Sequence, residues 1–257
     1  MEQNLSKKTR TESDLIGSRE VPESALYGVQ TLRGIENFRI SKFHLNEYPL
    51  FIQALAITKM GAAVANRELD LLTEEQTDAI LRACKEILEG KHHEQFPVDM
   101  IQGGAGTTTN MNINEVVANR ALELMGHQRG EYQYCSPNDH VNRSQSTNDA
   151  YPTAIHIGLY YTHLKLVKHF EVLIEAFRKK GREFAHIIKM GRTQLEDAVP
   201  MTLGQTFNGF ASILEHEVKN LDFAAQDFLT VNMGATAIGT GITAEPEYAE
   251  KCIAALR

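Results

Sequence analysis

Cysteine is scarce in this sequence and never occurs in a paired spacing. Cys84, Cys135 and Cys252 lie far apart, and no Cys-x-x-Cys occurs among the 257 residues. This pattern argues against a disulfide framework and against a thiolate metal site. No apolar run is long enough to span a membrane. Residues 1–13 lack the apolar core of a secretory signal, and we expect them to form a disordered or weakly held lead. These absences predict a reduced, cytoplasmic protein that has no membrane partner.

An excess of positive charge is also absent. The formal net charge is -7, which argues against nucleic acid or an anionic membrane as the main partner. The chain is 42% hydrophobic and 23% charged, as is typical of a globular protein that buries a core. Catalytic motifs are missing too: the sequence contains no His-Glu-x-x-His and no Ser-His-Asp order with a nucleophile elbow.

Helical spacing of apolar residues dominates the chain, whereas the alternation typical of strands is scarce. Pro49 and the Thr73–Gln76 capping box mark two helix starts. Gly90 and Gly126 are natural helix ends, and Gly181 is expected to break or kink a long helix. We therefore predict a mainly α protein. Helices are expected over residues 50–69, between the capping box and Gly90, between the glycine-rich segment that begins at residue 103 and Gly126, over 153–180 and 202–233, and after residue 246.

The densest polar segment is S-P-N-D-H-V-N-R-S-Q-S-T-N-D at residues 136–149. It precedes the apolar run of residues 154–157, so its donors and acceptors must bind one another or a ligand. Ser146, Thr147 and Asn148 together offer two hydroxyls and an amide to an anionic oxygen. The alternative is a helix N-cap, because Ser, Thr, Asn and Asp all cap helices well.

Two further segments share this character. Residues 103–110 read G-G-A-G-T-T-T-N, so glycine backbone and the Thr107 hydroxyl are expected at a helix N-terminus, where an anion is favoured. A glycine turn with a threonine cap is the structural alternative. Residues 191–200, which include Thr193 and Gln194, interrupt two helical patterns with polar groups. Three such segments suggest one composite anion site built from neutral hydrogen-bond donors.

Four motifs make the chain resemble the aspartase/fumarase superfamily, and within it the aspartate ammonia-lyases. They are G-S-R-E-V-P-E-S-A-L-Y-G-V-Q-T-L-R at 17–33, G-G-A-G-T-T-T-N-M-N-I-N-E-V at 103–116, the segment at 136–149, and G-R-T-Q-L-E-D-A-V-P-M-T-L-G-Q at 191–205. The resemblance implies reversible deamination of L-aspartate to fumarate and ammonia through an aci-carboxylate intermediate. It also implies a homotetramer with shared active sites, no required cofactor, no resident metal, and activation of some members by Mg²⁺.

The resemblance assigns substrate-binding roles by position. Thr107, Ser146 and Thr147 would surround the carboxylate that gains charge, and Asn148 would hold the amino group. Thr193 and Gln194 would bind the other carboxylate from a neighbouring subunit. The family's Gly-Ser-Ser loop, which carries the catalytic serine base, is absent from the 257 residues. We therefore expect an N-terminal portion, inactive alone, with an N-terminal lyase domain at 1–148 and the first part of a central helical bundle at 149–257.

Two alternatives stay open. A fumarase would use water in place of ammonia. Fumarases and many relatives carry histidine where this sequence has Gln194, so a histidine proton role there is excluded. A non-enzymatic scaffold could retain the fold without the chemistry. His92, His93 and Asp99 suggest a metal site, but adjacent histidines point to different faces of a regular element, so we expect a solvated or hydrogen-bonded pair.

Overall fold

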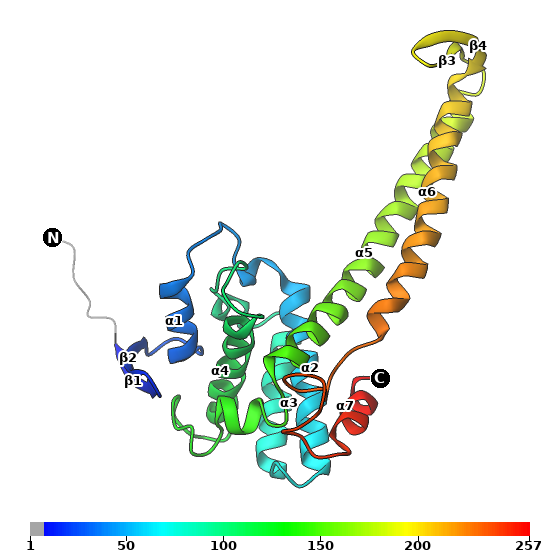
Figure 1. Cartoon of the computed structure of the whole chain (residues 1–257). Coiled ribbons are helices and arrows are strands. Elements are labelled where there is room, and N and C mark those ends of the chain that lie inside the picture. The colour runs from blue at the N-terminus through cyan, green and yellow to red at the C-terminus, as the bar shows by residue number, and fades with distance from the viewer. Residues whose placement is uncertain (1–7) are drawn as a thin grey trace, which may run out of the picture. The chain divides into compact units, whose positions relative to one another are not determined.

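The computed structural model describes residues 8–257 and is mainly helical, as predicted (Figure 1). The helices are α1 (Val29–Asn37), α2 (Pro49–Glu68), α3 (Glu74–Leu88), α4 (Thr107–Leu124), α5 (Thr147–Glu183), α6 (Leu203–Ala225) and α7 (Tyr248–Leu256). Two small antiparallel hairpins pair β1 (Thr9–Asp14) with β2 (Gly17–Pro22), and β3 (Ile188–Thr193) with β4 (Glu196–Thr202). None of the helices within residues 8–257 is long and apolar enough to cross a membrane.

The chain divides into two compact units. The first holds the described residues up to Gly158 together with Val231–Arg257, and the second is Leu159–Thr230. Helix α5 begins in the first unit, and its residues from Leu159 onward belong to the second. The domain boundary expected between residues 148 and 149 stays a prediction.

The core of the first unit lies between α2, α3 and α4. Helix α2 packs on α3 and α7, and α3 packs on α4. Their inward faces are fully buried and include Ile52, Ile80, Ile87, Ile113 and Leu122. Burying each such side chain contributes roughly 1.5–3 kcal/mol. The predicted helix signals are confirmed here: Pro49 opens α2, Thr73 and Gln76 form the capping box of α3, and Gly90 and Gly126 take positive φ where α3 and α4 end.

The expectation that residues up to 13 form a loose lead is wrong for the described part of that segment. Strand β1 pairs with β2 from Thr9 opposite Pro22 to Asp14 opposite Gly17. Arg10 also donates to the carbonyl oxygens of Pro22 and Ala25, at 3.0 and 2.7 Å. These partners lie 12 and 15 residues away, so a local reading of polar composition could not find them. Residues 1–7 lie outside the described part.

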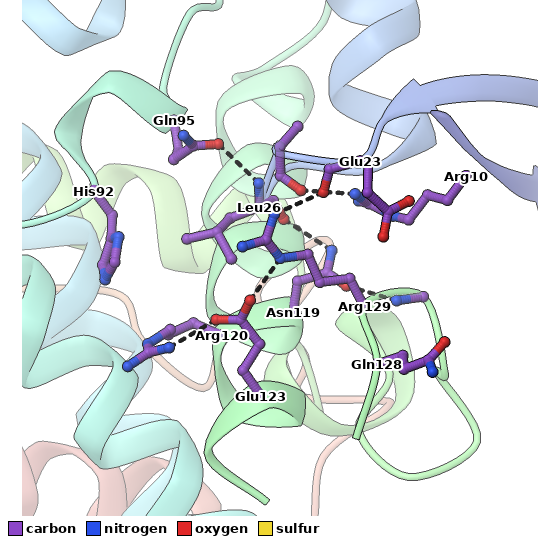
Figure 2. A network of polar contacts seen from close by, with 12 residues as sticks. Arg10, Glu23, Leu26, His92, Gln95, Asn119, Arg120, Glu123, Gln128 and Arg129 are labelled. Atoms are coloured by element: carbon purple, nitrogen blue, oxygen red, sulfur yellow. Dashed lines mark hydrogen bonds and ion pairs between the residues drawn. The ribbon is translucent and has the colours of Figure 1, made fainter. Parts of the chain in front are cut away.

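The turn that follows β2 is held by side chains from distant elements (Figure 2). The Leu26 N–H donates to Gln95 Oε1 at 2.8 Å, and the Leu26 carbonyl accepts from Asn119 Nδ2 at 2.8 Å. Arg129 donates to the Glu23 carbonyl and to the carboxylate of Glu123. The turn has little regular structure, so these side chains satisfy its backbone groups in place of a helix or sheet.

The backbone N–H groups at the start of helix α1 donate to a buried carboxylate. Glu115, on α4, accepts the N–H groups of Gly28, Gln30 and Thr31 at 2.7–3.0 Å. These are among the first N–H groups of α1, which have no partner inside the helix. Gly28 is required because a Cβ there would lie 2.7 Å from the Tyr132 hydroxyl. The motif at 17–33 is thus bound tightly to α4.

The second unit is a helical hairpin capped by a strand hairpin. Figure 1 shows the later part of α5 running beside α6, with β3 and β4 at their end. His163 bonds Asp222 at 2.9 Å and Arg178 bonds Glu215 at 2.8 Å, so the helices are antiparallel. Apolar side chains remain exposed on both helices; Val172, Ile213 and Phe223 are 72%, 60% and 83% exposed.

Two expectations about these helices are wrong. Helix α5 continues through Gly181 to Glu183, because the missing side chain accommodates Asn208 of α6: a Cβ at 181 would lie 2.5 Å from Asn208 Oδ1. The long helix predicted over 202–233 ends at Ala225 and continues as a 3₁₀ turn, Gln226–Leu229. Glycine at 181 therefore serves close helix packing and not a break.

The ion pair between Glu86 of α3 and Arg120 of α4 predicts an acid-sensitive contribution to stability. Hydrogen bonds from Arg120 to Glu86, at 2.6 and 2.8 Å, lower the pKa of Glu86 to about 2. Because this folded-state pKa lies below the usual 4.5, the contribution is present above pH 4.5 and is lost as the pH falls towards 2. Glu86→Gln should lower the free energy of unfolding at pH 7 by about 1 kcal/mol.

Urea unfolding across pH 2.5–7 checks this prediction, with Glu89→Gln as the control, because within residues 8–257 Glu89 forms an ion pair only with the exposed Lys91. The difference between wild type and Glu86→Gln should shrink as the pH falls. A difference that stays constant with pH would show that the variant acts through packing and not through charge.

The close contact between α5 and α6 predicts opposite outcomes for two glycines of one helix. A Cβ at Gly204 would strike the Gly181 carbonyl oxygen and lie 2.8 Å from Ala185 Cα, both backbone atoms that cannot swing away. Gly209 has nothing within 4 Å. Gly204→Ala should cost roughly 1–3 kcal/mol of stability, whereas Gly209→Ala should be neutral or stabilising by up to about 1 kcal/mol. Equal unfolding midpoints for the two variants would refute the close contact.

Candidate functional site

The N-terminus of α5 is capped by the residues that the sequence singled out. Ser146 Oγ accepts the N–H of Asn148 at 3.1 Å, and the Asp149 carboxylate accepts the N–H of Ser146 at 3.0 Å. The capping alternative is therefore correct for Ser146, but it uses only one lone pair of the hydroxyl. Within residues 8–257 no acceptor takes the Ser146 hydroxyl proton, which stays able to donate to a ligand.

Thr147 is positioned by helix α4. Its Oγ1 accepts from Asn110 Nδ2 at 3.1 Å, so this hydroxyl also retains its proton for donation. Asn110 lies one turn after Thr107 on α4, and residues three apart share a helix face. The structure thus connects the start of α4, where Thr107 lies, to the start of α5, where Ser146 and Thr147 lie.

A buried lysine of α2 links α4 to the polar segment that precedes α5. Lys59 of α2 is 1% exposed, and its Nζ donates to Asn110 Oδ1, Asn142 Oδ1 and Gln145 Oε1 at 2.8, 3.1 and 2.8 Å. Burial lowers the pKa of Lys59 to about 7. Three donated bonds require the ammonium form, so the amide oxygens oppose that effect. Sequence reasoning missed Lys59, although a lysine on the buried face of an alanine-rich helix was a visible signal.

The glycine segment forms the other wall of the site. Gly104 and Gly106 take φ of +81° and +89°, which disfavour any side chain. A Cβ at Gly106 would lie 2.5 Å from the ring of Tyr151, so the loop approaches α5 closely. Gln102 holds the loop against α4, because it accepts the Thr109 N–H and donates to the Thr109 hydroxyl, both at 2.9 Å. The expected threonine cap is wrong, because the N-cap of α4 is Gly106 and no side chain caps it. The tight glycine turn itself is compatible with an anion site.

Asn148 and the glycine loop line one open depression of about 400 Å³, formed by Met100, Gln102, Gly104, Ala105, Gly106, Asn148, Tyr151 and Pro152. The depression lies at the N-termini of α4 and α5, where helix dipoles and unpaired N–H groups favour an anion. It is large enough for a small dicarboxylate and contains no carboxylate that would repel one.

Thr193 and Gln194 lie in the second unit, at the turn between β3 and β4. Gln194 and Leu195 both take positive φ, +49° and +67°, as a two-residue hairpin turn of type I′ requires. Neither is glycine, so the turn carries a conformational cost that is uncommon outside functional loops. Leu195 is 98% exposed. Thr107, Ser146, Thr147 and Asn148 belong to the first unit, and of these four Asn148 lines the depression, whereas Thr193 and Gln194 belong to the second unit.

The residues that suggested a metal have other partners. His92 bonds the carboxylate of Glu86 at 2.9 Å, and His93 bonds the carbonyl of Ile87 at 2.9 Å. Asp99 accepts the backbone N–H groups of Ile40, Ser41 and Ile101. No cluster of three or more His, Cys, Asp or Glu suited to a metal ion occurs in residues 8–257, so no residue is assigned to Mg²⁺.

Comparison with known proteins gives one consistent family. Residues 17–257 match the Lyase family. The chain is 58% identical over 240 residues to an aspartate ammonia-lyase of Pseudomonas fluorescens, covering 93% of this chain and 50% of that protein. It is 55% identical over 245 residues to an aspartate ammonia-lyase of Escherichia coli, covering 95% and 51%. The chain therefore spans about half the length of the curated relatives it matches.

Solved structures agree with this assignment. A cobalt-bound fumarate lyase:delta crystallin from Brucella melitensis superposes with a TM-score of 0.94 at 51% identity, covering 97% of this chain and 54% of that one. A class II fumarase from Schistosoma mansoni superposes with a TM-score of 0.88 at 35% identity, covering 97% and 52%. From the match over residues 17–257, the chain belongs to the Lyase family.

Proposed function

We propose that the whole protein is an ammonia-lyase that converts L-aspartate to fumarate and ammonia. The observation that carries this proposal is the pair of hydroxyls at the start of α5. Ser146 and Thr147 each accept one protein N–H, and neither hydroxyl proton has an acceptor within the described residues. Relatives at 55–58% identity that are named aspartate ammonia-lyase support the substrate.

The hydroxyls would act on the difficult step of the reaction. Removal of a proton from the carbon next to one carboxylate leaves an electron pair that delocalises onto that carboxylate, giving an aci-carboxylate dianion. Ser146, Thr147 and Thr107 then donate to the oxygens that gain charge, and the N-termini of α4 and α5 favour it. The electron pair returns to form the carbon–carbon double bond as the C–N bond breaks. We assign the proton-abstracting base to the serine of the family's Gly-Ser-Ser loop.

Asn148 would select the leaving group. Its Nδ2 donates to the carbonyl of Ala237 at 2.8 Å, which leaves Oδ1 as the free end of the amide. An amide oxygen accepts a proton from a substrate ammonium. Asn148 lines the same depression as the glycine loop, so the amine and the reacting carboxylate would lie side by side.

The remaining carboxylate would be held by Thr193 and Gln194 of a neighbouring subunit. Both residues offer neutral donors at an exposed hairpin turn. The exposed apolar side chains of α5 and α6, among them Val172, Ile213 and Phe223, support a homotetramer in which these helices pack together. Gln194 cannot transfer a proton near neutral pH, so its role is binding alone.

Enzyme assays on a chimera test the proposed activity. Because the chain covers half of its relatives' length, residues 1–257 would replace the matching half of the Pseudomonas fluorescens enzyme. We expect fumarate, followed by ultraviolet absorbance, to form from L-aspartate and not from L-malate. Formation from malate alone would assign the hydratase reaction. Silence with both substrates, from a chimera that is folded and assembled, would favour a scaffold.

The role of the hydroxyls has its own matched variants. Thr147→Val removes the hydroxyl and preserves the shape of the side chain, whereas Thr147→Ser retains the hydroxyl. We expect Thr147→Val and Ser146→Ala each to lower kcat by roughly 10²–10³-fold, and Thr147→Ser to retain most of it. Ser18→Ala, on the exposed β2 strand, is the control for a lost surface hydroxyl. A Thr147→Val variant as active as wild type would remove this residue from the mechanism.

A further inference from the structure

Helix α5 contains a proline in its second turn. Pro152 has no N–H, so the carbonyl of Asn148, four residues earlier, loses its helical hydrogen bond. This carbonyl belongs to the residue that we assign to the substrate amine. A backbone carbonyl released in this way requires another donor.

The chain supplies that donor from a distant segment. Asn232 Nδ2 donates to the Asn148 carbonyl oxygen at 3.1 Å, across 84 residues of sequence. In return, Asn148 Nδ2 donates to the carbonyl of Ala237 at 2.8 Å. Residues 232–237, called the clamp segment below, therefore hold Asn148 at both its main chain and its side chain.

A buried carboxylate keeps the clamp segment in place. Asp149, fully buried, accepts the N–H groups of Gly234 and Thr236 at 3.1 and 2.8 Å, besides that of Ser146. Thr236 has φ of +56°, which a residue with a side chain rarely adopts without such support. Gly234 has φ of +90°, and a Cβ there would lie 2.8 Å from Ala249 Cα. The segment is thus held in one conformation.

We propose that Asn232 is a positioning residue that gives the site its preference for an amine leaving group, by fixing Asn148 through the carbonyl that Pro152 leaves unbonded. The hydrogen bond to the Ala237 carbonyl uses one Nδ2 proton of Asn148. The Oδ1 of Asn148 therefore faces away from Ala237 and can accept a hydrogen bond from the substrate ammonium. This inference rests on the proposed function for the identity of the ligand. The hydrogen bond itself does not depend on that function.

The first test measures the reverse reaction in the chimera described above, with ammonium and fumarate varied separately. Asn232→Ala should raise the KM for ammonium about tenfold and leave the KM for fumarate unchanged, because only the amine contact is loosened. Asn220→Ala, which removes an equally exposed asparagine bonded to Glu217, is the control and should change neither value. An equal rise in both KM values, or no rise in either, would overturn the proposal.

A variant of Pro152 provides a second test, whose expected result differs from the result of a purely structural role for Asn232. Pro152→Ala restores an N–H to the Asn148 carbonyl, so Asn232→Ala in that background should alter the KM for ammonium less than twofold. The same effect of Asn232→Ala in both backgrounds would show that the residue acts by another route.

Thermal unfolding of the 257-residue chain separates this inference from the proposed function. Asn232→Ala should lower Tm by about 2–4 °C in the wild-type background and by less than 1 °C beside Pro152→Ala. If the wild-type chimera releases no fumarate from aspartate, the proposed function fails and the amine role fails with it. The Tm cycle then still decides whether the hydrogen bond exists, and equal Tm losses in both backgrounds would exclude it.

Discussion

The first unit depends on how the buried amino group of Lys59 is satisfied. An unpaired charge at such a position would cost several kcal/mol, so the three amide oxygens of Asn110, Asn142 and Gln145 must lie where they do. These amides come from α4 and from the polar segment before α5. Asn110 also donates to Thr147, so the constraint at Lys59 reaches the proposed substrate site through one side chain. The position of the proposed site thus follows from the need to satisfy the buried amino group of Lys59.

Helix α4 contacts several of the sequence motifs of the first unit. Its start carries Thr107 and Asn110 at the site, its middle carries Glu115 under the start of α1, and Asn119 binds the turn at Leu26. The motif at 17–33 thus binds the same helix that bears the proposed site, two to three turns after its start. The clamp segment does the equivalent for α5, where Asp149 and Asn232 hold the turn that contains Asn148. Two helix N-termini, each stabilised from outside, define the depression between them.

The sequence predicted what depends on local chemistry. Helix starts at Pro49 and Thr73 and helix ends near Gly90 and Gly126 follow from capping and backbone preference, and they are confirmed. The polar segments at 103–110 and 136–149 were predicted to lie at helix N-termini, and both do. The misses depend on distant partners. Strand β1 needs β2 and the carbonyl groups that Arg10 binds, and Gly181 is explained by the approach of Asn208. The roles of Lys59 and Asn232 depend on residues 51 to 86 positions away. The roles of Thr107, Ser146, Thr147, Asn148, Thr193 and Gln194 stay predictions.

The proposed site is complementary to charge that appears only during the reaction. The most direct measurement is the affinity of the active chimera for a nitronate analogue of the aspartate aci-carboxylate, compared with its affinity for succinate. Sites of this kind bind analogues of the reacting state at least about 10²-fold more tightly than ground-state ligands. We expect such a preference for the nitronate, and we expect it to be lost in Thr147→Val but not in Thr147→Ser. Equal affinity for nitronate and succinate in the wild-type chimera would contradict it.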